Sequence, residues 1–246
     1  MKQTTFDELL SSFKVQPDLN RKFWMKNNQL NPRIRKALLL IAKNFYDSID
    51  LKNKPKIKDI VFMGSLANYN YSEYSDVDIH LLFDFGEKKD ILAQFFLLAK
   101  AKWNNKHDVT IKGYDVEVYA ADQNDPYTAT GVYSVLKDMW IKEPKRQVPV
   151  VDVKNIRNKV VYFTAQYKEL LHQFHQDELD GLDTKVKKLR EKIGKFRQSG
   201  LSSGGEYSTE NLTFKVLRRL GYMDKLADLQ NTVTDQQLSV KEMNYE

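Results

Sequence analysis

Residues 60–85 read IVFMGSLANYNYSEYSDVDIHLLFDF. An apolar run is followed at once by Gly64 and Ser65, and a second apolar run begins with Asp76 and Asp78. Alternate residues of a β-strand share a face and lie about 6.6 Å apart, so the two Asp side chains would share one face. Two carboxylates at that spacing repel each other unless a cation lies between them. The stretch therefore predicts a strand, a glycine turn and a second strand that begins at a cation site.

The composition excludes several other kinds of site. The chain has 246 residues, of which 41% are hydrophobic and 29% charged, and it has no cysteine. Disulfides, thiolate nucleophiles and cysteine-bound zinc are therefore excluded. The net charge of +6 permits an anionic partner such as nucleic acid or a nucleotide. No stretch approaches the roughly 18 apolar residues of a membrane span, and the first residues lack a signal-peptide core, so we expect a cytoplasmic protein without a membrane partner.

The pattern of apolar residues divides the chain into a mixed part and a helical part. Residues 1–28 predict an N-terminal helix and extension, and residues 29–150 alternate between strand and helix patterns, which indicates an α+β (mixed α/β) domain. Apolar residues at intervals of three and four make 151–231 a C-terminal helical domain, with a flexible break at SGLSSGG, 199–205. The tail, 232–246, has weak periodicity and is expected to fray.

Residues 87–105 favour a helix between the second and third predicted strands. Helical spacing places Ile91, Phe95 and Leu98 on one side of it, together with the stem of Lys102.

Two later apolar runs, HDVTI and YDVEVYAA, predict a hairpin around a Lys-Gly pair. Asp115 and Glu117 share a face of the second run. If this strand lies beside the one that contains Asp76 and Asp78, three or four carboxylates converge on one patch. Hard cations such as Mg²⁺ prefer oxygen ligands, and such a patch suffices for two ions.

The residues between the first apolar run and Asp76 are of types that can bind a nucleotide. A glycine where a strand turns into a helix lets the backbone approach a phosphate, which the following amides and the Ser65 hydroxyl can hold. Tyr69, Tyr71 and Tyr74 either stack on a nucleotide base or pack the short helix and loop around them.

Taken together, these residues resemble the signature of the polymerase-β-type nucleotidyltransferase superfamily. That signature is an apolar residue and Gly, then Gly or Ser, a spacer of about ten residues, and Asp, apolar, Asp or Glu, apolar. Here MGS ends at Ser65, residues 66–75 form the spacer, and DVDI begins at Asp76. The family adds a third acidic residue between apolar neighbours on a later strand, which Glu117 in VEV fits best, with Asp115 in YDV as the rival.

The resemblance covers roughly residues 30–122 and implies both a fold and a reaction. The fold is a mixed sheet flanked by helices, here followed by the helical region. The metal site is two Mg²⁺ ions, for which Mn²⁺ can substitute, held by Asp76, Asp78 and the third carboxylate. Gly64 and Ser65 would hold the phosphates of a nucleoside triphosphate such as ATP. An acceptor hydroxyl would then attack the α-phosphate in line, and pyrophosphate would leave.

The acceptor is not determined by these motifs. The segment KVKKLREKIGKFR, 185–197, holds seven basic residues and one Glu, which slightly favours an RNA acceptor over a protein, although a solvated helix face explains the same charge. Two other functions stay open. One is a catalytically silent or antitoxin-like module that binds a partner protein. The other is a glycosyltransferase with an Asp-x-Asp motif, which would leave Gly64 and Ser65 unexplained.

Overall fold

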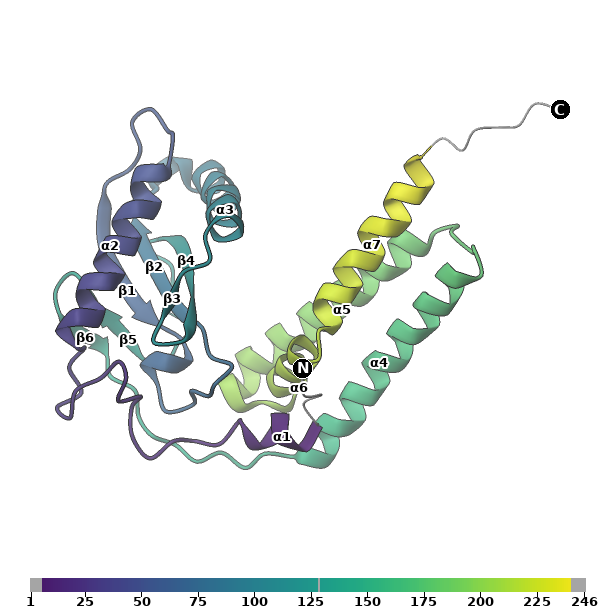
Figure 1. The fold of residues 1–246 in the computed structure, drawn as a ribbon, viewed down its shortest axis with the longest axis horizontal. Helices are drawn as coiled ribbons and strands as arrows, with labels where there is room; N and C mark the ends of the chain where they lie inside the picture. Colours follow the sequence, from purple (N-terminus) through teal and green to yellow (C-terminus); the bar gives the residue numbers. More distant parts are fainter. Residues whose placement is uncertain (1–5, 128, 240–246) are drawn as a thin grey trace. The chain divides into compact units, whose positions relative to one another are not determined.

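The computed structural model describes residues 6–127 and 129–239 of the chain. They form two compact units (Figure 1). One unit, Ser12–Val148, contains the β-sheet, and the other combines the N-terminal segment to Ser11 with the chain from Pro149 onward. The chain is thus a mixed α/β protein with a mixed sheet and a helical C-terminal region, which confirms the predicted fold class.

The sheet unit is built around six strands in the order β3-β4-β2-β1-β5-β6. Strands β2 and β4 pair in parallel, and the other neighbouring pairs are antiparallel. The predicted hairpin is present as β3 with β4, and β5 forms a second antiparallel pair with β6. The bounds are α2 Pro32–Ser48, β1 Ile57–Met63, β2 Val77–Phe83, α3 Lys89–Lys106, β3 Thr110–Ile111, β4 Tyr114–Asp122, β5 Val132–Ser134 and β6 Met139–Lys142, with short 3₁₀ helices η1 Ser65–Ala67 and η2 Gly86–Lys88.

Helix α2 begins at a favourable cap. The side chain of Asn31 accepts a hydrogen bond from the backbone N–H of Arg33, and Pro32 occupies the first helical position, where its missing N–H costs nothing.

Helix α3 buries a different side from the one that the helical spacing suggested. Phe96 and Trp103 are buried, whereas Ile91 and Leu98 are 74% and 71% exposed. Because α3 carries apolar residues around most of its circumference, its pattern alone does not select a face. The two large aromatic rings lie one heptad apart and occupy the core side, where they bury the most area.

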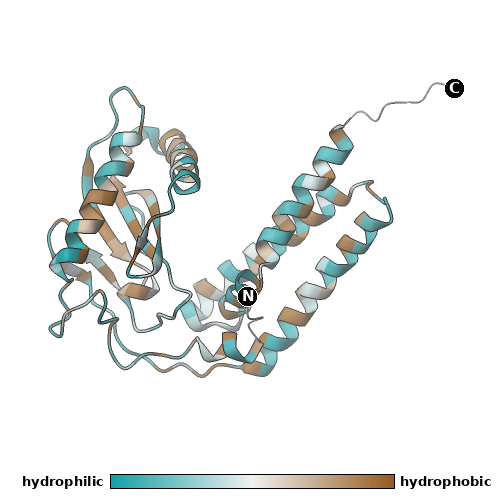
Figure 2. Ribbon diagram, viewed as in Figure 1, coloured by the Kyte–Doolittle hydropathy of each residue, from teal (hydrophilic) through white to brown (hydrophobic). Residues whose placement is uncertain are grey.

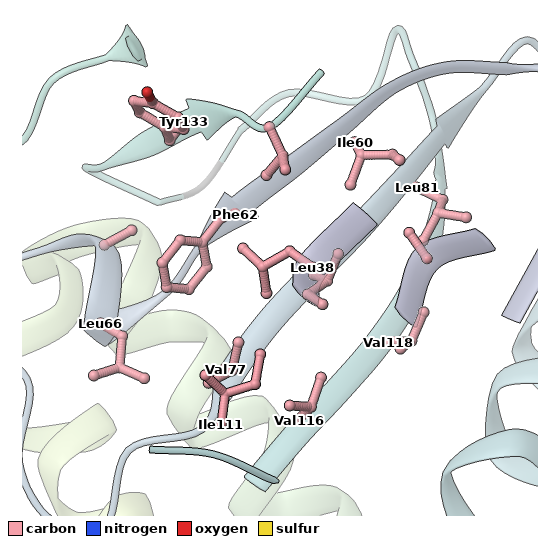
Figure 3. Packing of buried hydrophobic residues seen from close by; sticks show 14 of the residues in the cluster. Leu38, Ile60, Phe62, Leu66, Val77, Leu81, Ile111, Val116, Val118 and Tyr133 are labelled. Carbon is pink, nitrogen blue, oxygen red and sulfur yellow. The ribbon is translucent and has the colours of Figure 1, made fainter. Parts of the chain in front are cut away.

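One face of the sheet forms the hydrophobic core of this unit (Figure 3). Val77 on β2 and Val116 and Val118 on β4 point toward it together with Phe62 on β1 and Leu38 on α2. These strands are largely brown in Figure 2, in agreement with that burial. Residues with the opposite alternation on the same strands therefore lie on the other face of the sheet.

The second unit is helical. Its elements are α1 Phe6–Ser11, α4 Val153–His175, α5 Leu182–Gly204, η3 Gly205–Tyr207, α6 Thr209–Arg219 and α7 Tyr222–Leu238. Its buried side chains come from all four long helices and include Phe163, Val186, Ile193, Val216 and Leu226. No helix in the described part of the chain is both long and apolar enough to cross a membrane.

Two expectations about this unit are wrong. The predicted break at 199–205 is helical through Gly204, because Gly200 lets α5 and α6 approach closely. A Cβ at Gly200 would lie 2.4 Å from the Cβ of Glu210 and 2.6 Å from Oγ of Ser208. The tail expected to fray from residue 232 is helical as far as Leu238, and Val233 is fully buried. Residues 240–246 lie outside the described part.

Candidate functional site

Strand register brings two of the predicted carboxylates to adjacent positions. Asp78 on β2 is aligned with Met63 on β1 and with Glu117 on β4. Aligned residues of a parallel pair point to the same face from strands about 4.8 Å apart. Since Val77 and Val116 occupy the core face, Asp78 and Glu117 lie on the opposite face, and both are half-buried. Asp76 lies one residue before β2.

The rival carboxylate, Asp115, lies one step further along β4 on the same face as Glu117. It is aligned with Thr110 of the edge strand β3 and is exposed. The two candidates for the third carboxylate thus differ in surroundings, because Glu117 is half-buried beside Asp78 of β2, whereas Asp115 is exposed beside the edge strand β3.

Position 64 requires glycine, because the backbone there lies close to the Asp78 side chain. Its φ of 85° lies in the region that favours glycine. A Cβ at Gly64 would lie 2.0 Å from Oδ2 of Asp78, so the backbone after β1 touches the Asp78 carboxylate. The glycine turn and the carboxylate, separated in sequence by the spacer, therefore form one site.

The spacer is held by a hydrogen-bond network at its base. Oγ of Ser65 donates to Oγ of Ser75 at 2.7 Å, and Oγ of Ser75 accepts from the backbone N–H of Ser72 at 3.0 Å. The Ser65 hydroxyl, predicted to hold a phosphate, here joins the start of the spacer to its end. Tyr69 and Tyr71 pack against the hydrophobic core, which agrees with the packing interpretation of these two tyrosines.

Two residues that the sequence interpretation missed contact the Glu117 side of the site. The Tyr119 hydroxyl donates a hydrogen bond to the Glu117 carboxylate. Nζ of Lys100, on α3, lies 3.4 Å from the centroid of the Tyr119 ring, and the His80 imidazole stacks on that ring with centroids 4.6 Å apart and an interplanar angle of 9°. The alternation that pairs Asp115 with Glu117 extends to Tyr119 and was a usable signal. Nothing in the local sequence indicates Lys100.

The site is electrostatically coupled across these contacts. Burial, and next the positive charge of Lys100, lower the pKa of His80 to about 4, so His80 is neutral at pH 7. Burial also lowers the pKa of Lys100, while the carboxylates of Glu117 and Asp78 act in the opposite direction. Burial and then the hydrogen bond to Glu117 raise the pKa of Tyr119, which keeps its hydroxyl protonated and able to donate.

The donor atoms of this face suit a hard divalent cation. Asp76, Asp78 and Glu117 supply carboxylate oxygens, the ligand type that Mg²⁺ prefers. Within residues 6–127 and 129–239, however, no three Asp, Glu, His or Cys side chains are grouped as a metal site, and the Glu117 carboxylate is engaged by Tyr119. The donor chemistry and the strand register therefore fit a metal, and the side chains are not gathered around one.

Comparison with known families agrees with the site geometry. Residues 48–143 match the family described as the nucleotidyltransferase domain. The match contains all six strands, β1 to β6, with both halves of the signature and the Glu117 strand, and it ends before α4. No curated protein matches the chain. Residues 48–143 thus match a nucleotidyltransferase domain, which is consistent with the resemblance to the polymerase-β-type nucleotidyltransferase superfamily.

Proposed function

We propose that the protein is an enzyme that transfers a nucleoside monophosphate from a nucleoside triphosphate to an acceptor hydroxyl, with release of pyrophosphate. The observation that carries this proposal is the alignment of Asp78 with Glu117 on the face away from the core, with the Gly64 turn against Asp78. Half-buried like charges on neighbouring strands repel each other, which costs free energy. Their cost is offset when the face binds cations.

The carboxylates would hold Mg²⁺. Asp76, Asp78 and Glu117 are the proposed ligands of two ions, and Mn²⁺ would substitute. When bound, the metal would supply positive charge to the reacting and leaving phosphate oxygens. We assign the third carboxylate to Glu117 rather than Asp115, because Glu117 is aligned with Asp78 and is oriented by Tyr119. Hydrogen bonds to ligating carboxylates commonly set their orientation.

The turn after β1 would bind the phosphates. Gly64 brings the backbone to the edge of the carboxylate face, and the amides that follow it are the first of η1, where N–H groups have no acceptor within the helix. The Ser65 hydroxyl would rotate from Ser75 to a phosphate oxygen. We therefore propose Gly64 and Ser65 as the phosphate-binding residues, with ATP the first nucleotide to test.

The proposed acceptor is RNA, and a protein hydroxyl is the second choice. The support is the charge of α5, where residues 185–197 carry seven basic side chains and one Glu. A helix of that charge attracts phosphodiester groups through electrostatics that do not depend on sequence.

A labelling experiment tests the reaction itself. The protein is incubated with Mg²⁺, total RNA or lysate, and each nucleoside triphosphate labelled at either the α- or the γ-phosphate. Nucleotidyl transfer predicts that the α-label enters an acceptor and the γ-label leaves as pyrophosphate. The double variant Asp76→Asn/Asp78→Asn should abolish the transfer. Asp84→Asn/Asp90→Asn, which removes two exposed carboxylates of the same unit, should not.

Transfer of the γ-label would instead show a kinase, and label transfer that survives Asp76→Asn/Asp78→Asn would place the reaction elsewhere. Failure to transfer either label and to bind any nucleoside triphosphate in the presence of Mg²⁺ would overturn the proposal.

A further inference from the structure

A groove within the helical unit combines cations with an apolar floor. It lies where α5, α6 and α7 meet and has a volume of about 440 Å³. Lys187 and Arg190 of α5 line it together with Phe214 of α6 and Met223 of α7, and Glu191 contributes one negative charge. Figure 1 shows these three helices side by side, and contacts join α5 to both α6 and α7. None of the residues that line this groove belongs to the proposed nucleotidyltransferase site.

Arg197 extends the basic surface along α5 and is held in position. Its guanidinium carbon lies 4.4 Å from the centroid of the Phe214 ring, and its Nε donates to Oδ1 of Asn211 at 3.3 Å. Asn211 in turn donates from Nδ2 to the backbone oxygen of Glu206 at 2.6 Å. This guanidinium is therefore ordered against the same aromatic ring that lines the groove.

Positive charge is concentrated beyond Phe214. Lys215, the next residue of α6, lies within electrostatic reach of Arg197, Arg218 and Arg219, and of the Glu206 carboxylate. The basic side chains of α5 and α6 therefore add to the positive potential around this part of the helical unit.

The length of the basic surface indicates a polymer. Lys187 and Arg197 are ten residues apart on one helix, which corresponds to about 15 Å. A row of cations of that length, beside aromatic and apolar side chains, is the arrangement that binds the backbone and the bases of a single strand. A single mononucleotide would engage only one end of it.

We propose that the groove of α5, α6 and α7 binds single-stranded nucleic acid. Lys187, Arg190 and Arg197 contact its phosphates, and its bases lie against Phe214 and Met223. The binding step stands on the groove alone. Only the role of the bound strand as the acceptor rests on the proposed function.

The test is fluorescence anisotropy of the full chain with a labelled single-stranded RNA of about 20 nucleotides, without Mg²⁺ or nucleotide. The test variant is Lys187→Gln/Arg190→Gln, and the control is Lys154→Gln/Lys168→Gln, which removes the same charge from exposed positions of α4. The test variant should weaken binding about tenfold or more. It should also reduce the slope of log K against log salt by about 1.4, because each phosphate contact of a single strand contributes about 0.7. The control should leave both values close to wild type.

A second variant tests the apolar floor. Phe214→Leu keeps the groove apolar and should weaken binding about fivefold, since stacking of one base on an aromatic ring accounts for at least that factor. Single-stranded DNA and duplex RNA serve as competitors. Competition by either single strand supports the proposal and shows which strand the groove prefers, whereas tighter binding of the duplex overturns it. Equal losses in the test and control variants, or no measurable RNA binding by wild type, overturn it as well.

The outcomes separate this inference from the proposed reaction. RNA binding should persist in Asp76→Asn/Asp78→Asn, which removes catalysis alone. Nucleotidyl transfer that continues at full rate onto RNA in a chain whose groove no longer binds RNA would contradict the role of the bound strand as the acceptor, and it would leave both the binding step and the reaction standing.

Discussion

At Gly64 the backbone comes so close to Asp78 that no side chain fits between them. A Cβ would lie 2.0 Å from Oδ2 of Asp78, and the φ of 85° is unfavourable for any L-residue. We therefore expect Gly64→Ala to displace the carboxylate and to reduce nucleotidyl transfer at least a hundredfold. Steady-state kinetics with an α-labelled nucleotide measure the loss.

Gly113 offers the matched control for this prediction. Its φ is 84°, and nothing lies within 4 Å of a Cβ built there. Gly113→Ala should therefore carry only the backbone strain, about 1–2 kcal/mol of unfolding free energy, and keep its activity. Equal activity losses in the two variants would show that strain, rather than contact with Asp78, explains the glycine.

Tyr119 is expected to act as a positioning residue for Glu117. Tyr119→Phe removes the hydroxyl that donates to the Glu117 carboxylate and leaves the ring contacts with Lys100 and His80 in place. Loss of such a hydrogen bond typically costs 10- to 100-fold in metal affinity, which calorimetric titration with Mn²⁺ would detect.

Tyr69→Phe is the control, because the Tyr69 ring packs on the core away from the carboxylates. If Tyr119→Phe binds Mn²⁺ as tightly as wild type and Tyr69→Phe do, Glu117 is not a ligand that Tyr119 orients.

The residues of the site were predictable from the sequence to different degrees. The period of two places Asp78 and Glu117 on the face opposite their valine neighbours, and Gly64 follows from the break after an apolar run. The hydrogen bond from Tyr119 and the approach of Lys100 depend on side-chain orientation and on helix placement. The alternation along β4 places Tyr119 on the same face as Glu117 but does not determine its hydrogen bond, and no local pattern indicates Lys100.

At the scale of elements, α3 shows that an apolar pattern does not by itself identify the buried face of a helix. Phe96 is buried and Leu98 is exposed. We expect Phe96→Ala to lower the unfolding free energy by about 3–5 kcal/mol. Leu98→Ala should change it by no more than about 0.5 kcal/mol. Urea denaturation of both variants shows which face of α3 is buried. A larger loss of unfolding free energy for Leu98→Ala would show that α3 buries the opposite face.

Two glycines of α5 provide an internal comparison for the contact between α5 and α6. At Gly200 a new Cβ would overlap Glu210 and Oγ of Ser208, which caps α6. Gly200→Ala should therefore destabilise by about 1–3 kcal/mol. At Gly194 nothing lies within 4 Å of the added Cβ, and Gly194→Ala should stabilise the helix by about 0.5–1 kcal/mol. A change of the unfolding temperature in the same direction in both variants would contradict the close packing at Gly200.

The run SGLSSGG also shows where composition misleads. Gly and Ser usually mark a flexible segment, and the predicted break rests on that preference alone. Tertiary packing overrides it here, because a helix that must approach its neighbour closely needs a residue without a side chain at the contact.

At the scale of the molecule, the sequence predicts the elements better than their arrangement. The strands β1, β2 and β4 and the hairpin that contains β4 follow from local patterns. The parallel pairing of β2 with β4 joins residues about 40 positions apart and depends on how α3 crosses between them. Loop closure over that length leaves no signal in the local sequence, so the pairing was a condition of the site prediction rather than a result of it.

We propose that one face of the β2–β4 pair carries out nucleotidyl transfer. The most direct test compares the transfer of an α-labelled nucleotide by wild type and by two variants, Glu117→Gln and Asp115→Asn. Each variant removes one negative charge from β4. The register predicts that wild type and Asp115→Asn transfer the label and that Glu117→Gln loses at least a hundredfold in rate. Full activity of Glu117→Gln with loss in Asp115→Asn, or no transfer by wild type to any acceptor, would contradict the claim.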